Sequence, residues 1–216
     1  MAEDIFIVGA GTYGAVIADL AEVCGYSVTG FYDDDLSKTG KSVLGKPVLG
    51  KLDYEKDIRA NANYVVAIGN NEIHVAKSKE IIKKGGVIPC LIHPRAEISK
   101  YARIGKACII HALTYIWTEA EVGDFSIISP EVIVAHHTKI GEGCFIANGC
   151  RVGAGIHIAE RVFIGMGSTI MTGVKNIGRD TIIGAGSVVI KDIDQESVMA
   201  GVPAKFIRKN DSSHVN

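Results

Sequence analysis

An aliphatic β-branched residue occupies every sixth position of the chain from residue 98 to residue 170. A period of six matches neither the 3.6-residue repeat of an α-helix nor the two-residue alternation of a half-buried strand. It matches a short strand followed by a tight turn, repeated three times in a coil of about 18 residues. The positions, all isoleucine or valine, are Ile98, Ile104, Ile110, Ile116, Val122, Ile128, Val134, Ile140, Ile146, Val152, Ile158, Ile164 and Ile170.

Small side chains form a second column in the same segment, two residues before the aliphatic positions. Because stacked coils lie about 4.8 Å apart, the aliphatic side chains would form a dry interior and the small ones would fill the corners. The small positions include Ala96, Ala102, Cys108, Thr114, Ala120, Ser126, Thr138, Cys144, Cys150 and Ser168. After Ile170 the phase slips by one residue near Val174 and resumes at Ile177. The repeat predicts an all-β domain over residues 94–216, a left-handed parallel β-helix with a C-terminal tail.

Residues 1–93 alternate apolar, strand-like runs with amphipathic stretches. Strands are predicted over residues 4–8, 27–32, 64–68 and 87–92, and helices over about 13–24 and 72–84. Residues 35–50 contain glycine and proline and are predicted to form a loop. This alternation is typical of a small parallel sheet covered by helices, which predicts an α/β, Rossmann-like domain.

A glycine-rich segment follows the first predicted strand. Gly9, Gly11 and Gly14 have the spacing of a dinucleotide-binding turn, and Asp33 and Asp34 follow about 20 residues later. About 90 residues supply only half of a doubly wound dinucleotide fold. We therefore expect a mononucleotide or nucleotide-sugar site and no NAD; the alternative is that the glycines serve only a tight turn between strand and helix.

Composition excludes several classes of protein. The net charge of −1 and the 6% of aromatic residues argue against nucleic-acid binding, which needs a surplus of basic residues. No apolar run reaches the roughly 18 residues of a membrane span, and the N-terminal residues do not resemble a signal peptide. Five cysteines without CxxC spacing favour reduced thiols over disulfides or zinc. We expect a cytoplasmic enzyme that uses no metal.

Several motifs carry a resemblance to a known family. The repeat from Ile98 to about Ile207, closed by Gly201-Val202-Pro203-Ala204-Lys205, resembles the hexapeptide-repeat acyltransferases. With the Rossmann-like half, the chain resembles the sialic-acid O-acetyltransferase-like group, which includes bacterial nucleotide-aminosugar N-acetyltransferases; Ala67–Ile73 is especially similar to the latter. The resemblance implies a homotrimer with acetyl-CoA between neighbouring β-helices, and N-acetylation of a nucleotide-linked amino sugar in surface-glycan biosynthesis.

The resemblance also implies binding residues. The nucleotide-sugar set is Gly11, Thr12, Tyr13, Asp33, Asp34, Gly69 and Asn70, and the acetyl-CoA set is Phe145, Met166 and Ala185. Phe145 stands where some relatives carry a second histidine, so a hydroxyl acceptor or another acyl group is an alternative. His74 replaces an arginine of the relatives and is a candidate for phosphate contact.

Acetyl transfer from a thioester to an amine needs a base, and histidine has an unperturbed pKa of about 6.5. His136 and His137 follow Val134 at a turn, outside the interior columns. The resemblance implies that His136 is the general base. His137 replaces a frequent carboxylate, so His137 and Glu142 are candidates for catalytic support, and Glu142, Glu131 or a backbone carbonyl could orient His136.

Other interpretations remain open from the sequence. Cys108, Cys144 and Cys150 fall in the small-residue column, so we expect inert thiols and direct transfer in a ternary complex. Metal binding by His111 with the histidine pair is disfavoured by spacing, and His111 is expected on the surface. Alternative functions are a sugar O-acetyltransferase of sialic-acid type and a nucleotide-binding β-helix scaffold without activity.

Overall fold

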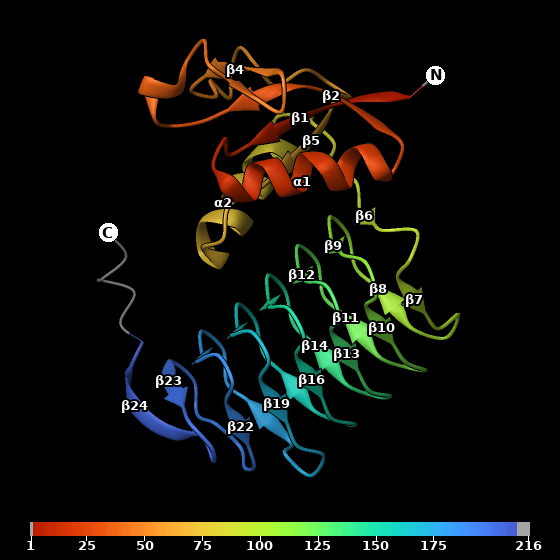
Figure 1. The fold of residues 1–216 in the computed structure, drawn as a ribbon, viewed down its shortest axis with the longest axis vertical. Helices are drawn as coiled ribbons and strands as arrows, with labels where there is room; N and C mark the ends of the chain where they lie inside the picture. Colours follow the sequence, from red (N-terminus) through yellow and green to blue (C-terminus); the bar gives the residue numbers. More distant parts are fainter. Residues whose placement is uncertain (1, 211–216) are drawn as a thin grey trace. The chain divides into compact units, whose positions relative to one another are not determined.

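The chain divides into two compact units. A computed structural model describes residues 2–210; unit 1 is Met1–Pro94 and unit 2 is Arg95–Asn216 (Figure 1). The predicted tail beyond residue 210 lies outside the described residues. Within residues 2–210, no helix combines the length and apolar character that crossing a bilayer requires.

Unit 1 is an α/β unit built on one sheet, as the alternating pattern predicted. Its sheet has the order β3-β4-β2-β1-β5, and β1 pairs in parallel with both β2 and β5. The elements are β1 (Glu3–Val8), α1 (Thr12–Val23), β2 (Tyr26–Tyr32), the 3-10 helix η1 (Leu36–Lys38), β3 (Ser42–Val43), β4 (Lys46–Gly50), β5 (Asn63–Val66), α2 (Asn71–Lys83) and β6 (Leu91–Ile92).

Two local predictions for unit 1 were wrong. Residues 35–50 are not a plain loop, because β3 and β4 form a hairpin and β4 extends the sheet beside β2. Residues 87–92 do not form one strand: Val87 makes an isolated parallel bridge to Asn63, and β6 covers two residues.

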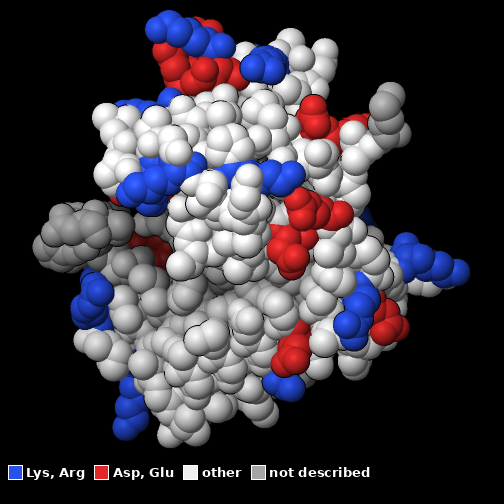
Figure 2. All heavy atoms as spheres, turned by 45° about the horizontal axis from the view of Figure 1, so that its top comes forward, with Lys and Arg blue, Asp and Glu red and all other residues white. Residues whose placement is uncertain are grey.

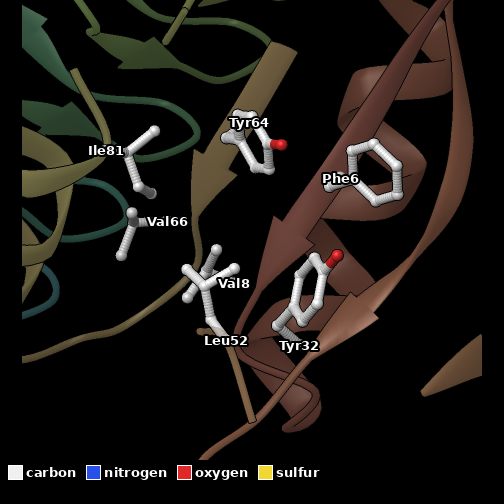
Figure 3. Packing of buried hydrophobic residues seen from close by; sticks show 7 residues of the cluster. All are labelled: Phe6, Val8, Tyr32, Leu52, Tyr64, Val66 and Ile81. Carbon is white, nitrogen blue, oxygen red and sulfur yellow. The ribbon is translucent and has the colours of Figure 1, made fainter. Parts of the chain in front are cut away.

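Both faces of the central strand β1 are buried. Ile5 and Ile7 alternate along the strand with Phe6 and Val8, and all four are almost inaccessible. On one face Phe6 stacks on Tyr64 with ring centroids 5.4 Å apart. Figure 3 shows this cluster, which comprises Phe6, Val8, Tyr32, Leu52, Tyr64, Val66 and Ile81. The packing fixes the ends of β1, β2 and β5, where the candidate residues lie.

Unit 2 is a parallel β-helix with three faces, which confirms the predicted architecture. Face 1 contains β9 (Ile109–Ile110), β12 (Ile127–Ile128), β15 (Phe145–Ile146), β18 (Phe163–Ile164), β21 (Ile182–Ile183) and β23 (Ser197–Ala200), and β24 (Lys205–Lys209) pairs with β23 in antiparallel fashion. Face 2 contains β7 (Glu97–Ile98), β10 (Tyr115–Ile116), β13 (Ile133–Val134), β16 (Arg151–Val152), β19 (Thr169–Ile170) and β22 (Val188–Val189). Face 3 contains β8 (Arg103–Ile104), β11 (Glu121–Val122), β14 (Lys139–Ile140), β17 (His157–Ile158) and β20 (Asn176–Ile177).

The register between coils is the one that the repeat predicts. Ile116 pairs with Val134, 18 residues later, and the aliphatic column from Ile110 to Val189 is buried. Beyond the slip, Ile158 pairs with Ile177, 19 residues later. The extra residue is accommodated where Thr172 bridges Val174, around Gly173 with φ +110°.

The small-residue column is polar as well as small. Its hydroxyl and thiol groups donate to backbone carbonyls 15 residues ahead, as Ser126 does to Gly141 O at 2.9 Å and Cys144 does to Ala159 O at 3.1 Å. Thr138 and Cys150 make the same contact with Gly153 and Gly165. The sequence predicted inert packing here, and the structure adds a ladder of corner hydrogen bonds, which satisfy these buried donors.

Acidic and basic side chains are interspersed on the molecular face shown in Figure 2. This distribution agrees with the formal net charge of −1 and contrasts with the single-sign basic surface that phosphate-backbone binding requires.

The burial of the corner thiols predicts which cysteines react. Burial raises the pKa of Cys144 to about 12 and also raises that of Cys150, so neither supplies thiolate near neutral pH. With a thiol-specific disulfide reagent, the native protein should react at the half-buried Cys24 and Cys90 and should spare Cys108, Cys144 and Cys150. Peptide mapping of the labelled protein checks this, with denatured protein as the control in which all five react.

Candidate functional site

Unit 1 has a pocket at the carboxyl ends of β1, β2 and β5. The cavity measures about 280 Å³ and is lined by Val8, Gly9, Gly11, Tyr32, Asp33, Asp34, Lys38, Leu52, Ala67, Ile68 and Lys77. Ligands of open α/β sheets bind outside the carboxyl ends of the strands, so this is the expected place for a small-molecule site. Three predicted residues, Gly11, Asp33 and Asp34, line it.

The three glycines of the turn have different roles. Gly9 has φ +117°, and a Cβ there would lie 2.6 Å from the carbonyl oxygen of Ala67. At Gly14 a Cβ would lie 2.0 Å from the carbonyl oxygen of Gly9. Close packing of the turn therefore requires glycine at both positions, as expected if these two glycines serve the turn between strand and helix. Gly11 has open space around it and an ordinary φ of −89°, and no side chain caps α1 there. The start of α1 therefore carries no side-chain cap, and a helix start of this kind can bind an anion.

Asp33 organises the pocket wall. Its Oδ2 accepts hydrogen bonds from Ala10 N at 2.7 Å and Lys38 Nζ at 2.9 Å, and its Oδ1 accepts from Asp35 N. Burial alone would raise the pKa of Asp33, but these hydrogen bonds outweigh it and hold the pKa below its usual value. The carboxylate joins the glycine-rich turn to the end of β2.

A second ion pair lies beside it. Lys77 Nζ donates to Asp34 Oδ2 at 2.9 Å. Burial is the largest influence and would lower the pKa of Lys77, but the hydrogen bond to Asp34 and the interactions with Asp34 and Tyr54 together outweigh it, and the pKa lies above its usual value. Lys38 and Lys77 were missed by the sequence analysis, because each stands in a polar stretch without a distinguishing pattern. The pocket therefore offers two cations as well as two carboxylates.

Among the described residues that line the pocket, four predicted nucleotide residues are missing: Thr12, Tyr13, Gly69 and Asn70. Thr12 and Tyr13 begin α1, and the Asn70 side chain caps α2 by accepting a hydrogen bond from Ile73 N at 2.9 Å. His74 is buried within α2, which contradicts its expected contact with phosphate.

On unit 2, His136 and His137 lie at the corner between faces 2 and 3, immediately after β13. Both are exposed, as predicted. Nδ1 of His136 lies 3.0 Å from Nδ1 of His137, and Nε2 of His137 lies 3.1 Å from Oε2 of Glu119. The three side chains form a connected row that ends in a carboxylate.

An aromatic side chain flanks this row. The ring of Trp117, from the preceding coil, has its centroid 6.2 Å from that of His136, and Tyr115 lies 5.5 Å from Trp117. The His136 ring therefore has two neighbours: the Trp117 ring of the preceding coil and the His137 ring.

The residue beside His136 is one of the two candidates for catalytic support, but the nearby carboxylate is neither Glu142 nor Glu131. That residue is His137, and the carboxylate behind it is Glu119, which the sequence analysis missed. Glu131 lies between β12 and β13, at the corner between faces 1 and 2, and so belongs to another edge of the coil. Glu142 follows β14 at the third corner and stays a prediction. The 18-residue coil was the signal that could have found Glu119, because 119 and 137 differ by one full coil.

The predicted acetyl-CoA residues lie elsewhere on unit 2. Met166 and Ala185 are exposed at the corner between faces 1 and 2, and Phe145 is on face 1, packed against Phe163 with centroids 5.5 Å apart. Face 2 separates that corner from His136, by roughly 15–20 Å at about 3.3 Å per residue. One chain alone does not bring the two predicted sets together.

His111 and a metal site were two other features that the sequence raised. His111 is buried at the corner between faces 1 and 2, contrary to the expected surface position and away from His136. Among residues 2–210, no group of three or more His, Cys, Asp and Glu side chains is arranged to hold a metal ion.

Comparison with known proteins gives matches over both units. The PglD N-terminal domain model matches residues 4–81, and the bacterial transferase hexapeptide model (six repeats) matches residues 119–154. A crystal structure of PerB from Caulobacter crescentus, in complex with CoA and GDP-perosamine, is 30% identical with a TM-score of 0.88, over 96% of this chain and 99% of that one. The acetyltransferase domain of PglB from Neisseria gonorrhoeae, in complex with acetyl coenzyme A, is 29% identical with a TM-score of 0.58, over 96% and 100%.

A curated relative adds a local match. YJL218W of Saccharomyces cerevisiae, named as an acetyltransferase, is 56% identical over 43 residues, which span 20% of this chain and about a fifth (21%) of that protein. The structural similarity extends over nearly the whole chain, and both family models fall on the units that the fold defines. The chain belongs to the hexapeptide-repeat acetyltransferases that carry a PglD-type N-terminal domain.

Proposed function

We propose that this protein transfers the acetyl group of acetyl-CoA to the amino group of a nucleotide-linked sugar. The observation that carries the proposal is the similarity over 96% of the chain to PerB, which was solved with CoA and GDP-perosamine. The unit 1 pocket supports the nucleotide part, because it combines a glycine turn, an uncapped helix start and two lysines. Such groups are suited to a diphosphate.

His136 is the general base of the proposed reaction. The acceptor nitrogen attacks the thioester carbonyl carbon, so that a C–N bond forms and the C–S bond breaks. Nε2 of His136 takes the proton that the amine loses and delivers it to the departing thiolate. Two other structures of the Caulobacter enzyme carry a single histidine replaced by asparagine or alanine with both ligands bound, which supports a histidine in this role. The buried cysteines favour direct transfer without an acyl-enzyme.

The active protein is proposed to be a homotrimer. The separation of His136 from Met166 and Ala185 across face 2 supports this, because a neighbouring copy could present the second corner. Each site would then take its base from one chain and its acetyl-CoA contacts from the next.

Replacement of His136 tests the reaction and its base together. We expect thiol release from acetyl-CoA with GDP-perosamine or another nucleotide amino sugar, and weaker release with the matching hydroxyl sugars. His136→Asn should lower kcat/KM by at least about tenfold, or about 1.4 kcal/mol, because the amine proton has no acceptor. A smaller loss removes His136 from the role, and a preference for hydroxyl sugars identifies O-acetylation.

The glycine turn gives a matched pair of variants. Gly11→Ala should fold normally, since its Cβ meets open space, but should weaken nucleotide binding because the methyl group projects where a ligand would approach the turn. Gly14→Ala should fail to fold stably, since its Cβ would meet the carbonyl oxygen of Gly9. Thermal unfolding with and without a nucleoside diphosphate separates these effects. Equal ligand stabilisation of Gly11→Ala and the parent protein would contradict the nucleotide assignment.

A mixing experiment tests the shared site. His136→Asn and Ala185→Trp should each be inactive alone, the first without its base and the second with the proposed acetyl-CoA corner blocked. Trimers reassembled from an equal mixture should recover about a quarter of the parent activity, because one site in four then combines both intact corners. No recovery, in trimers shown by mass to be mixed, would place each site within a single chain.

A further inference from the structure

We propose that Glu119 is a positioning residue of the acetyl-transfer site, which acts through His137 to hold His136 in its base form. The inference rests on the proposed role of His136 and adds a residue one coil away in the sequence. It is carried by two contacts on one line: Glu119 Oε2 to His137 Nε2 at 3.1 Å, and His137 Nδ1 to His136 Nδ1 at 3.0 Å.

The stacking of the coils fixes these contacts. Glu119 and His137 occupy the same position of consecutive turns, with φ of +57° and +59°. The backbone N–H of His137 donates to Thr118 O at 3.2 Å, and that of Gly155 donates to His136 O at 3.1 Å. The corner is therefore tied to the coil before it and the coil after it.

Both side chains stand at a position that favours glycine. The equivalent turn residues of other hexads, such as Gly143, Gly149 and Gly155, have φ between +65° and +69°. An L residue in this left-handed region has an unfavourable backbone conformation. Other turns also hold non-glycine residues in this conformation, such as Phe125 at φ +60° and Arg161 at φ +54°, so the turn itself places the two side chains one above the other without indicating their role.

The chemistry of the row fixes the direction of each hydrogen bond. A carboxylate only accepts, so Nε2 of His137 carries the proton that it donates to Glu119. Nδ1 of neutral His137 is then an acceptor, and the proton of that contact belongs to Nδ1 of His136. A neutral imidazole carries one ring proton, so Nε2 of His136 is left with a free lone pair. That nitrogen is the one that the proposed reaction needs.

The row also prepares the site for charge. When His136 takes the acceptor's proton at Nε2, the imidazolium gains a positive charge, and the nearest carboxylate on the row is Glu119. Glu119 and His137 are each more than half exposed, and an exposed pair of this kind contributes little to folding. Substitution of Glu119 should therefore change catalysis and leave stability nearly unchanged.

Kinetics of thiol release with acetyl-CoA and GDP-perosamine, or the amino sugar that proves active, provide the first test. Glu119→Gln should lower kcat by about tenfold or more, because the amide can donate to His137 and reverse the tautomer, while both KM values stay within about twofold. Glu196→Gln is the matched control: it has the same residue type and a similar turn conformation, with φ +56°, at the corner between faces 3 and 1, away from both corners of the proposed site. It should retain the parent kcat, and thermal unfolding should show both variants folded.

A double variant tests whether Glu119 acts through His137. His137→Glu puts a carboxylate directly beside His136, so the imidazole no longer depends on Glu119. In that background Glu119→Gln should cause no further loss of kcat, whereas it causes the full loss in the parent chain. An equal loss in both backgrounds would overturn the relay, because the effect of Glu119 would then bypass His137.

The histidine tautomer can be read without any substrate. In 15N-histidine-labelled protein at about pH 8, long-range 1H–15N correlations should show His136 protonated at Nδ1, with its resonances assigned from His136→Asn. Glu119→Gln should shift His136 toward protonation at Nε2, and an unchanged spectrum would overturn the inference. If His136→Asn is inactive while Glu119→Gln is fully active, the relay fails and the proposed function stands. If His136→Asn is active, the base assignment itself fails.

Discussion

The stacking of one coil on the next is the constraint on which the rest of the molecule depends. Isoleucine and valine side chains contact their equivalents in neighbouring coils, and the backbone of each short strand bonds to the strands before and after it. Burial of these columns removes apolar surface from water at about 25 cal/mol per Å². Because a coil has 18 residues in most of the helix, a surface residue has, besides its neighbours in sequence, neighbours 18 positions away that lie about 4.8 Å from it. Side chains at a corner can therefore interact with side chains of the neighbouring coil as well as with their neighbours in sequence.

The two units carry different parts of the proposed chemistry, and different constraints shape them. In unit 1, Gly9 and Gly14 permit the close packing of strand and helix, which leaves Gly11 and the start of α1 open to the pocket. Asp33 is engaged by Ala10, Asp35 and Lys38, so it shapes the wall as well as lining it. In unit 2 the interior is apolar and the reactive groups are at the corners, where the chain turns and side chains reach solvent. The proposed binding and transfer sites thus lie at the places where each fold leaves polar groups exposed.

The sequence predicted the features that repeat, and missed those that depend on contacts between distant residues. The columns of the β-helix, the slip near Val174 and both helices of unit 1 were evident, because each is a periodic or local pattern. The β3–β4 hairpin was missed, since Gly45 and Pro47 resemble loop residues although Lys46–Gly50 pairs with β2. Lys38 and Lys77 were missed, because long polar side chains give no pattern until a fold brings them to a pocket. Glu119 was missed for another reason: it is 18 residues from His137 in the sequence, and only the stacking of consecutive coils brings the two side chains together.

In the Glu119–His137–His136 row, the carboxylate comes from a residue one coil away and not from the position next to the base in sequence. The resemblance led us to expect a carboxylate next to the base, and His137 stands there instead. An imidazole can transmit orientation, because accepting at one ring nitrogen requires donating at the other when it is neutral. The carboxylate is then one ring farther from the base, so its direct attraction for the imidazolium is weaker. Control of the tautomer does not weaken in the same way, since it depends on the order of donors and acceptors and not on distance. A relay of this kind retains the form of the base that accepts a proton while the charge of Glu119 stays in solvent, where it is screened and costs little to maintain.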